Sequence, residues 1–386
     1  MRKIYNRSVG AALAALSLLC LSFGSCSSED IQTSNADNIG PQPMEFYIST
    51  IDANADGTTR GTPSEDLEVS AGIYAYTYDP NAGIWENGGG TAPDFMINEE
   101  MQFAGLKWLT VSPFDKMPVE RAVRFYAYYP FGHDSISVTD DTHPNAPVIT
   151  YKVPSDVEEQ VDLLAGSSFD AGGSIREYST DTQNSTTPEA VQLTLSHILT
   201  AVRFQIGECR EAGRIKSITL TSILGENSYS LQRKADDSGF NGWSNKNLDN
   251  HSDLYTDFSI DVDKAIKTTQ ATPQVVTSDD QWLMMIPQTL SEDSKLVVVY
   301  NSGGSDHTME VSIDNYKWRA GKKVTYTLNI LSLQRLTVKT TVENWSSGLE
   351  FTDGKSDSSP TIDTDMTVSD WDDSNNNDIA SDDPRD

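Results

Sequence analysis

From residue 44 onward the chain is a series of short runs in which successive side chains alternate between two faces, and this pattern constrains the fold most. In "AGIYAYTY", Ile73, Ala75 and Thr77 alternate with three tyrosines, and "AVRFYAYY" has the same texture. Alternation with a period of two is typical of β-strands. Turn-forming residues separate the runs, and no segment of ten or more residues shows a capped helical stripe. The sequence therefore predicts an all-β fold.

The β-rich region is too long for one sandwich, so we expect two β-sandwich domains in tandem. The composition becomes polar and rich in turn formers between residues 171 and 190, which we interpret as a loop near the boundary. The N-terminal domain is predicted to span residues 44–185 and the C-terminal domain residues 186–350. Residues 26–43 are polar and without periodicity, and we interpret them as a tether.

The start of the chain is typical of a secretory signal. Arg2, Lys3 and Arg7 precede an apolar run from residue 9 to residue 23. This run is shorter than the roughly 20 residues that a membrane-spanning helix needs. Residues 1–25 are therefore predicted to be a signal peptide that is removed on export.

Cys26 directly follows this signal, and its neighbours favour lipid attachment. Gly24 and Ser25 are small residues of the kind that precede a lipoprotein cleavage site, and the "CSSED" that begins at Cys26 resembles the acidic export tag of Bacteroidetes surface lipoproteins. A disulfide with Cys209, the other cysteine of the mature chain, is the alternative. We expect Cys26 to carry lipid and Cys209 to be a lone structural thiol.

The charge and the motifs exclude several classes of function. The formal net charge is −29, so the basic surface that nucleic-acid binding requires is not expected. None of the five histidines has the spacing of a metal site, and no nucleophile elbow or phosphate-binding loop is found. The stretch "DANADG" lacks the glutamate that would complete a calcium loop. We expect no enzymatic activity, no metal and no cofactor apart from the covalent lipid.

Arg60 is the only basic residue between positions 8 and 106. It lies in "ANADGTTRGTPSED", a stretch that should be exposed and mobile. An arginine-specific, trypsin-like protease could cut there, between Arg60 and Gly61. The cut would separate the first strand, which contains Phe46 and Ile48 on one side, from the rest of the chain. The alternative is an isolated surface arginine without such a role.

The C-terminal extension, residues 351–386, contains one more strand pattern. Residues 352–386 include eleven aspartates and only two basic residues. Within residues 361–369, polar residues alternate with an opposite face that consists of Ile362, Thr364, Met366 and Val368. This segment fits either a final edge strand of the C-terminal domain or a strand that pairs with another molecule.

Seven motifs together resemble the fimbrillins, the type V pilins of Bacteroidales fimbriae. In order they are "RGTP", "GIYAY", "RFYAYYP", "VDLLAG", "LSHILTAVRFQI", "WRAGKKVTYTLNI" and "VENW". The resemblance covers residues 44–345. It implies two tandem transthyretin-like β-sandwich domains, transport as an outer-membrane lipoprotein and a place in a cell-surface fimbrium after processing.

The resemblance also implies how such a subunit assembles. Fimbrillins are cut by a trypsin-like protease after a basic residue in the first domain, and the groove left by the lost strand is filled by a strand from a neighbouring subunit. On this chain the cut falls after Arg60, the departing strand is residues 44–51 and the donor strand is residues 361–369. The expected partners are other pilin subunits, the protease and, before the cut, the outer membrane. The appended strand favours a stalk or adaptor subunit over a tip subunit.

A second function fits the sequence as well. Exposed aromatic side chains can stack on sugar rings, so the alternative is a surface lipoprotein that binds glycans. The tryptophans that could serve as its stacking platforms are Trp85, Trp108 and Trp243. The alternative, which we favour, is that they pack in the core or in turns.

Overall fold

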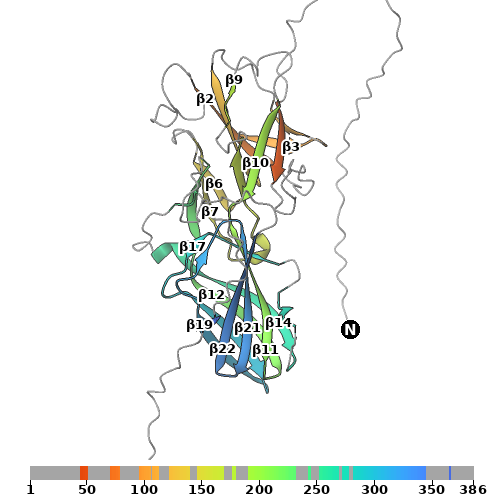
Figure 1. Ribbon diagram of the computed structural model, residues 1–386, viewed down its shortest axis with the longest axis vertical. Coiled ribbons are helices and arrows are strands. Elements are labelled where there is room, and N and C mark those ends of the chain that lie inside the picture. Colours follow the sequence, from red (N-terminus) through yellow and green to blue (C-terminus); the bar gives the residue numbers. More distant parts are fainter. Residues whose placement is uncertain are drawn as a thin grey trace, which may run out of the picture. The chain divides into compact units, whose positions relative to one another are not determined.

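The computed structural model describes residues 44–50, 70–78, 95–105, 107–112, 121–139, 146–168, 176–179, 190–231, 242–244, 252–268, 272–277, 281–344 and 365–366. These residues are almost entirely β-strands and the turns between them, so the predicted all-β fold is confirmed (Figure 1). All of them lie within one unit of the chain, Pro41–Asp386. These segments form strands because their side chains alternate between two faces, as the sequence shows.

The first sheet closes on itself. Its pairing order is β2-β3-β4-β1-β10-β8-β5, and β5 pairs back onto β2 along the whole length of both strands. A short eighth strand, β9, is also paired with β5. We call the seven closed strands the ring; a closed ring has no free sheet edge. The strands of this sheet are β1 (Glu45–Thr50), β2 (Ala71–Tyr78), β3 (Met96–Phe103), β4 (Trp108–Thr110), β5 (Ala122–Tyr129), β8 (Leu164–Ser167), β9 (Tyr178–Ser179) and β10 (Val191–His197).

Both faces of β2 and β5 are buried. Ile73 and Phe125 belong to the core of the ring, whereas Tyr126 and Tyr128 belong to a second core on the opposite face of the same strands. Burial raises the pKa of Tyr126 and of Tyr128 to about 12. These phenols are therefore neutral at physiological pH and act as packing and hydrogen-bonding groups.

Two further sheets, one of six strands and one of four, share the second core. In the six-stranded sheet β11, β21 and β22 lie side by side, with β11 parallel to β21 (Figure 1). Two sheets that enclose one apolar core are compatible with a β-sandwich. The six-stranded sheet contains β11 (Thr200–Cys209), β15 (Gln274–Val275), β16 (Leu283–Met285), β21 (Lys322–Ser332), β22 (Arg335–Asn344) and β23 (Asp365–Met366). The four-stranded sheet contains β12 (Gly213–Leu224), β14 (Tyr255–Ile266), β18 (Lys295–Ser302) and β19 (Ser305–Ser312).

Two strands that follow the predicted domain boundary between residues 185 and 186 pair with strands that precede it. β10 follows the boundary but belongs to the ring, and β13 (Glu226–Ser230) pairs with β7 (Val148–Lys152). The boundary itself stays a prediction. The remaining elements are β6 (Ile136–Thr139), β17 (Gln288–Thr289), β20 (Lys317–Trp318) and the short 3-10 helices η2 (Val157–Glu159) and η4 (Ser252–Leu254).

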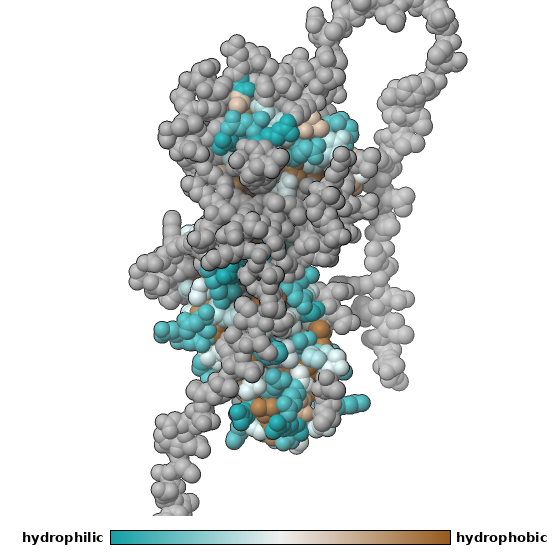
Figure 2. All heavy atoms as spheres, viewed as in Figure 1, coloured by the Kyte–Doolittle hydropathy of each residue, from teal (hydrophilic) through white to brown (hydrophobic). Residues whose placement is uncertain are grey.

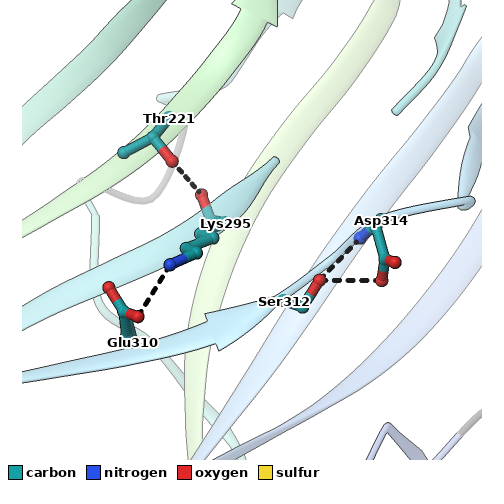
Figure 3. A network of polar contacts seen from close by, with 5 residues as sticks. All are labelled: Thr221, Lys295, Glu310, Ser312 and Asp314. Atoms are coloured by element: carbon teal, nitrogen blue, oxygen red, sulfur yellow. Dashed lines mark hydrogen bonds and ion pairs between the residues drawn. The ribbon is translucent and has the colours of Figure 1, made fainter. Parts of the chain in front are cut away.

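The visible surface of the described residues is mostly hydrophilic, with apolar side chains exposed only in small spots (Figure 2). On the four-stranded sheet, Figure 3 shows polar contacts typical of this surface. The Lys295 ammonium donates to Glu310 Oε1 at 2.8 Å, between β18 and β19. Nearby, the Ser312 hydroxyl donates to Asp314 Oδ1 at 2.7 Å.

Substitution of Lys295 by Ala is expected to have little effect on stability. Both side chains of its ion pair with Glu310 are more than 40% exposed, and such pairs contribute about 0–1 kcal/mol because water screens them. A double-mutant cycle with Glu310→Ala, followed by urea unfolding, measures this contribution. A coupling energy well above that range would show that the pair has a larger structural role.

Candidate functional site

β1 is one of the seven strands of the ring and is hydrogen-bonded on both sides. It is parallel to β10, where Phe46 is opposite Val191 and Ile48 is opposite Leu193. It is antiparallel to β4, where Phe46 is also opposite Trp108. Both neighbours are distant in the sequence, so β1 closes the ring entirely through tertiary pairing.

Two apolar side chains anchor β1 in the core of the ring. Phe46 is 0% exposed and Ile48 is 2% exposed. The Phe46 ring meets the Phe125 ring edge to face, with 5.6 Å between the centroids. Burial of each side chain contributes roughly 1.5–3 kcal/mol. The two residues therefore share one buried face, as the alternation in the sequence predicts.

The polar ties of β1 are weaker. The Glu45 carboxylate forms an ion pair with the Lys107 ammonium, and both side chains are partly exposed to water. The Met44 amide donates to the Thr110 hydroxyl at 3.3 Å. Exposed ion pairs contribute little to stability. β1 is thus held mainly by its two backbone ladders and by Phe46 and Ile48.

Removal of β1 would open the ring without breaking its other strand pairs. β4 would still be paired with β3, and β10 would still be paired with β8. The unpaired edges of β4 and β10 would then flank an apolar channel. We call this channel the β1 slot and define it by Trp108, Phe125, Val191 and Leu193, all of them 0–1% exposed.

The second predicted element of the site, the tail strand, is described only at two residues. Asp365 and Met366 form β23, which is antiparallel to β22 with Met366 opposite Val338 and Asp365 opposite Lys339. This pairing has the geometry of an edge strand of the six-stranded sheet. The donor role of residues 361–369 stays a prediction. The other predicted site residues lie outside the described residues: Cys26, Arg60, Gly61, Ile362, Thr364 and Val368.

Two of the three tryptophans considered for glycan binding, Trp108 and Trp243, are buried and not available for stacking. Trp108 is 1% exposed and packs against Phe103, and Trp243 is 3% exposed and packs edge to face against Tyr229. The indole nitrogen of Trp243 also donates to the Ile198 carbonyl at 2.6 Å. The core packing that we favour for these two residues is confirmed, and the alternative that they are exposed platforms is wrong. Trp85 lies outside the described residues.

Another tryptophan, Trp282, was not predicted as a feature of the site. The Arg203 guanidinium lies 4.3 Å from its ring centroid and the Lys323 ammonium lies 5.3 Å away. The Arg203 Nε also donates to the Thr325 hydroxyl at 3.1 Å. These cation–π contacts tie β11 and β21 to the segment before β16, so the ring of Trp282 is engaged within the fold.

The described part of the chain contains no group of three or more His, Cys, Asp or Glu residues that could hold a metal ion. Within the same residues, no helix has the length and apolar character needed to cross a membrane. Cys209 has a free, buried thiol that lies 3.1 Å from the Glu211 carbonyl oxygen.

The chain is similar in sequence to known fimbrial proteins. The sequence matches the model of a family described as fimbrillin-like over residues 59–345. It is 25% identical over 198 residues to the fimbrium subunit Fim1C of Phocaeicola vulgatus, and the match covers 47% of each chain. The chain thus spans about half the length of this relative.

A solved structure shows the same architecture. A crystal structure of a fimbrial protein from Bacteroides vulgatus aligns with 78% of this chain and 99% of its own, with a TM-score of 0.56 and 19% sequence identity. At this level of identity the likeness concerns the fold.

Proposed function

This chain belongs to the fimbrillin-like family, and from this premise we propose that it is a structural subunit of a surface fimbria that joins its neighbours by strand exchange. The family consists of fimbrial subunits and not of enzymes, and fimbriae are cell-surface appendages. The observation that carries the proposal is the position of β1, which closes a ring of strands through residues far away in the sequence.

The physics of strand addition explains why this position suits assembly. An open ring exposes two strand edges and an apolar channel, and both attract another β-strand. An incoming strand restores the two backbone ladders, while alternate side chains fill the channel and set the register. A neighbour that supplies this strand is joined along the whole length of the slot.

The connection after β1 supports a proteolytic trigger. β1 ends at Thr50 and β2 begins at Ala71, so Arg60 lies in the segment that joins them. A cut after Arg60 would leave β1 bound to the ring only by non-covalent contacts. Once β1 leaves, the lipid proposed on Cys26 leaves with it, so the outer membrane would no longer hold the subunit.

The tail supplies a candidate donor. Residues 361–369 alternate in the way that a half-buried strand requires, as β1 does with Phe46 and Ile48. Among the described residues of the tail, β23 pairs with β22 at Asp365 and Met366. We propose that the segment exchanges this pairing for the slot of another subunit.

Cleavage after Arg60 is expected to precede polymer formation. When the full-length chain is treated with an arginine-specific protease, mass spectrometry should find a product that begins at Gly61, and electron microscopy should find polymers. Arg60→Gln should abolish both results, because the protease needs the cationic side chain. Deletion of residues 361–371 should leave the cut intact but abolish the polymers. Polymers formed by chains that are uncut at Arg60, or by the deletion variant, would contradict the proposal.

A further inference from the structure

The two halves of β10 are held in different ways on the side away from β1. β8 pairs only with the second half, Thr194–His197. In the first half the Gln192 amide instead donates to the hydroxyl of Tyr178, at 3.0 Å. Tyr178 is in β9, which is paired with β5. Among the described residues, the Tyr178 side chain thus lies beside the first half of β10, where β8 does not pair.

The ring of Tyr178 supports the β1 slot from a second direction. Tyr178 is 1% exposed, and its ring meets Phe125 edge to face with 5.6 Å between the centroids. Phe125 in turn contacts Phe46 of β1 with the same separation. The Arg176 guanidinium covers the Tyr178 ring at 4.5 Å from its centroid. Tyr178 therefore touches both the backbone and the floor of the slot.

The contacts that place Tyr178 do not involve β1. Arg176 and Ser168 exchange two hydrogen bonds: the Arg176 amide donates to the Ser168 carbonyl at 2.8 Å, and the Ser168 hydroxyl donates to the Arg176 carbonyl at 3.1 Å. β9 itself is paired with β5 at Ala122 and Val123. Tyr178 would therefore stay in place when β1 leaves.

We propose that Tyr178 is a positioning residue of the β1 slot, which keeps the first half of β10 and the Phe125 ring ready for an incoming strand. This inference rests on the proposed strand exchange. When β1 is absent, residues 191–193 form part of a new sheet edge, and the Tyr178 hydroxyl restrains it through Gln192. An edge that is already ordered binds a strand more tightly, because less conformational freedom is lost on binding.

The test compares Tyr178→Phe, which removes only the hydroxyl, with Tyr128→Phe as a matched control. The Tyr128 hydroxyl is also hydrogen-bonded, to Asn98 Oδ1 at 2.7 Å and to the backbone of Gly132, but its side chain belongs to the second core and not to the core of the ring. Amide hydrogen exchange is measured first, on the intact full-length chains. Loss of one hydrogen bond corresponds to roughly a two- to tenfold change in an equilibrium. Exchange at residues 191–193 should accelerate by about that factor in Tyr178→Phe and should not change in Tyr128→Phe.

The second measurement uses full-length chains cut after Arg60 and a fluorescent peptide with the sequence of residues 44–51. The peptide should bind Tyr178→Phe about three- to tenfold more weakly than the unsubstituted chain, and it should bind Tyr128→Phe as tightly. Unchanged exchange in Tyr178→Phe, or equal losses of affinity in both variants, would overturn the proposal. If no chain binds the peptide, the proposed strand exchange between subunits is contradicted. The amide hydrogen-exchange rates alone then decide whether Tyr178 orders β10.

Discussion

Gly166→Ala is expected to destabilise the ring by about 3 kcal/mol, the upper end of the usual range for an overpacked core. Gly166 is in β8, opposite Leu195 of β10. A Cβ atom at position 166 would lie 1.8 Å from the carbonyl oxygen of Thr194 and 2.8 Å from its carbonyl carbon. Both are backbone atoms, so β10 itself would have to move away from β8. Urea unfolding of the full-length variant measures the loss.

The control for this prediction is Gly132→Ala. Gly132 has a φ of +69°, and a Cβ atom at this position would meet no other part of the chain within 4 Å. Alanine there therefore causes backbone strain without crowding. That strain costs roughly 1–2 kcal/mol. The excess loss in Gly166→Ala reports the close approach of β8 and β10. A loss no larger than that of Gly132→Ala would show that β10 can shift freely.

Local alternation was sufficient to predict the strands but not their partners. The period of two in "AGIYAYTY" and "AVRFYAYY" corresponds to β2 and β5, because alternation is a property of neighbouring residues. The insertion of β1 between β4 and β10 depends on residues far apart in the chain. No short stretch of sequence encodes that pairing, so the closed ring could not be derived from the alternation.

The roles of Gly166 and Tyr178 beside the slot could not be predicted from the sequence equally well. Gly166 ends the motif "VDLLAG", and a glycine within a strand is a known sign of close backbone approach. Tyr178 lies in the polar stretch of residues 171–190, which was interpreted as a loop. The structure places a short strand there, with Tyr178 in the core of the ring. The residues beside Tyr178 in the sequence are polar and do not indicate burial. Tyr178 is buried because it contacts β5 and β10, which lie elsewhere in the chain.

Phe46→Ala is expected to lower the free energy of unfolding of the uncut chain by about 3–5 kcal/mol, the usual cost of truncating a buried phenylalanine. The substitution removes the contact with the Phe125 ring and leaves a cavity in the core of the ring. Tyr47→Ala is the matched control, because Tyr47 is in the same strand but only half-buried. Thermal and urea unfolding of the full-length variants measure both losses.

The same variant distinguishes a strand that is released from one that is permanent. After a cut at Arg60, β1 stays in the ring only as long as its non-covalent contacts last. A loss of about 3 kcal/mol in those contacts corresponds to roughly a hundredfold weaker hold on the fragment, so the Phe46→Ala fragment should separate from the ring far sooner in size-exclusion chromatography. Once the fragment is gone, the two rings have identical sequences and should have equal stability. A stability difference that persists after complete cleavage would show that β1 remains bound and that the cut alone does not open the slot.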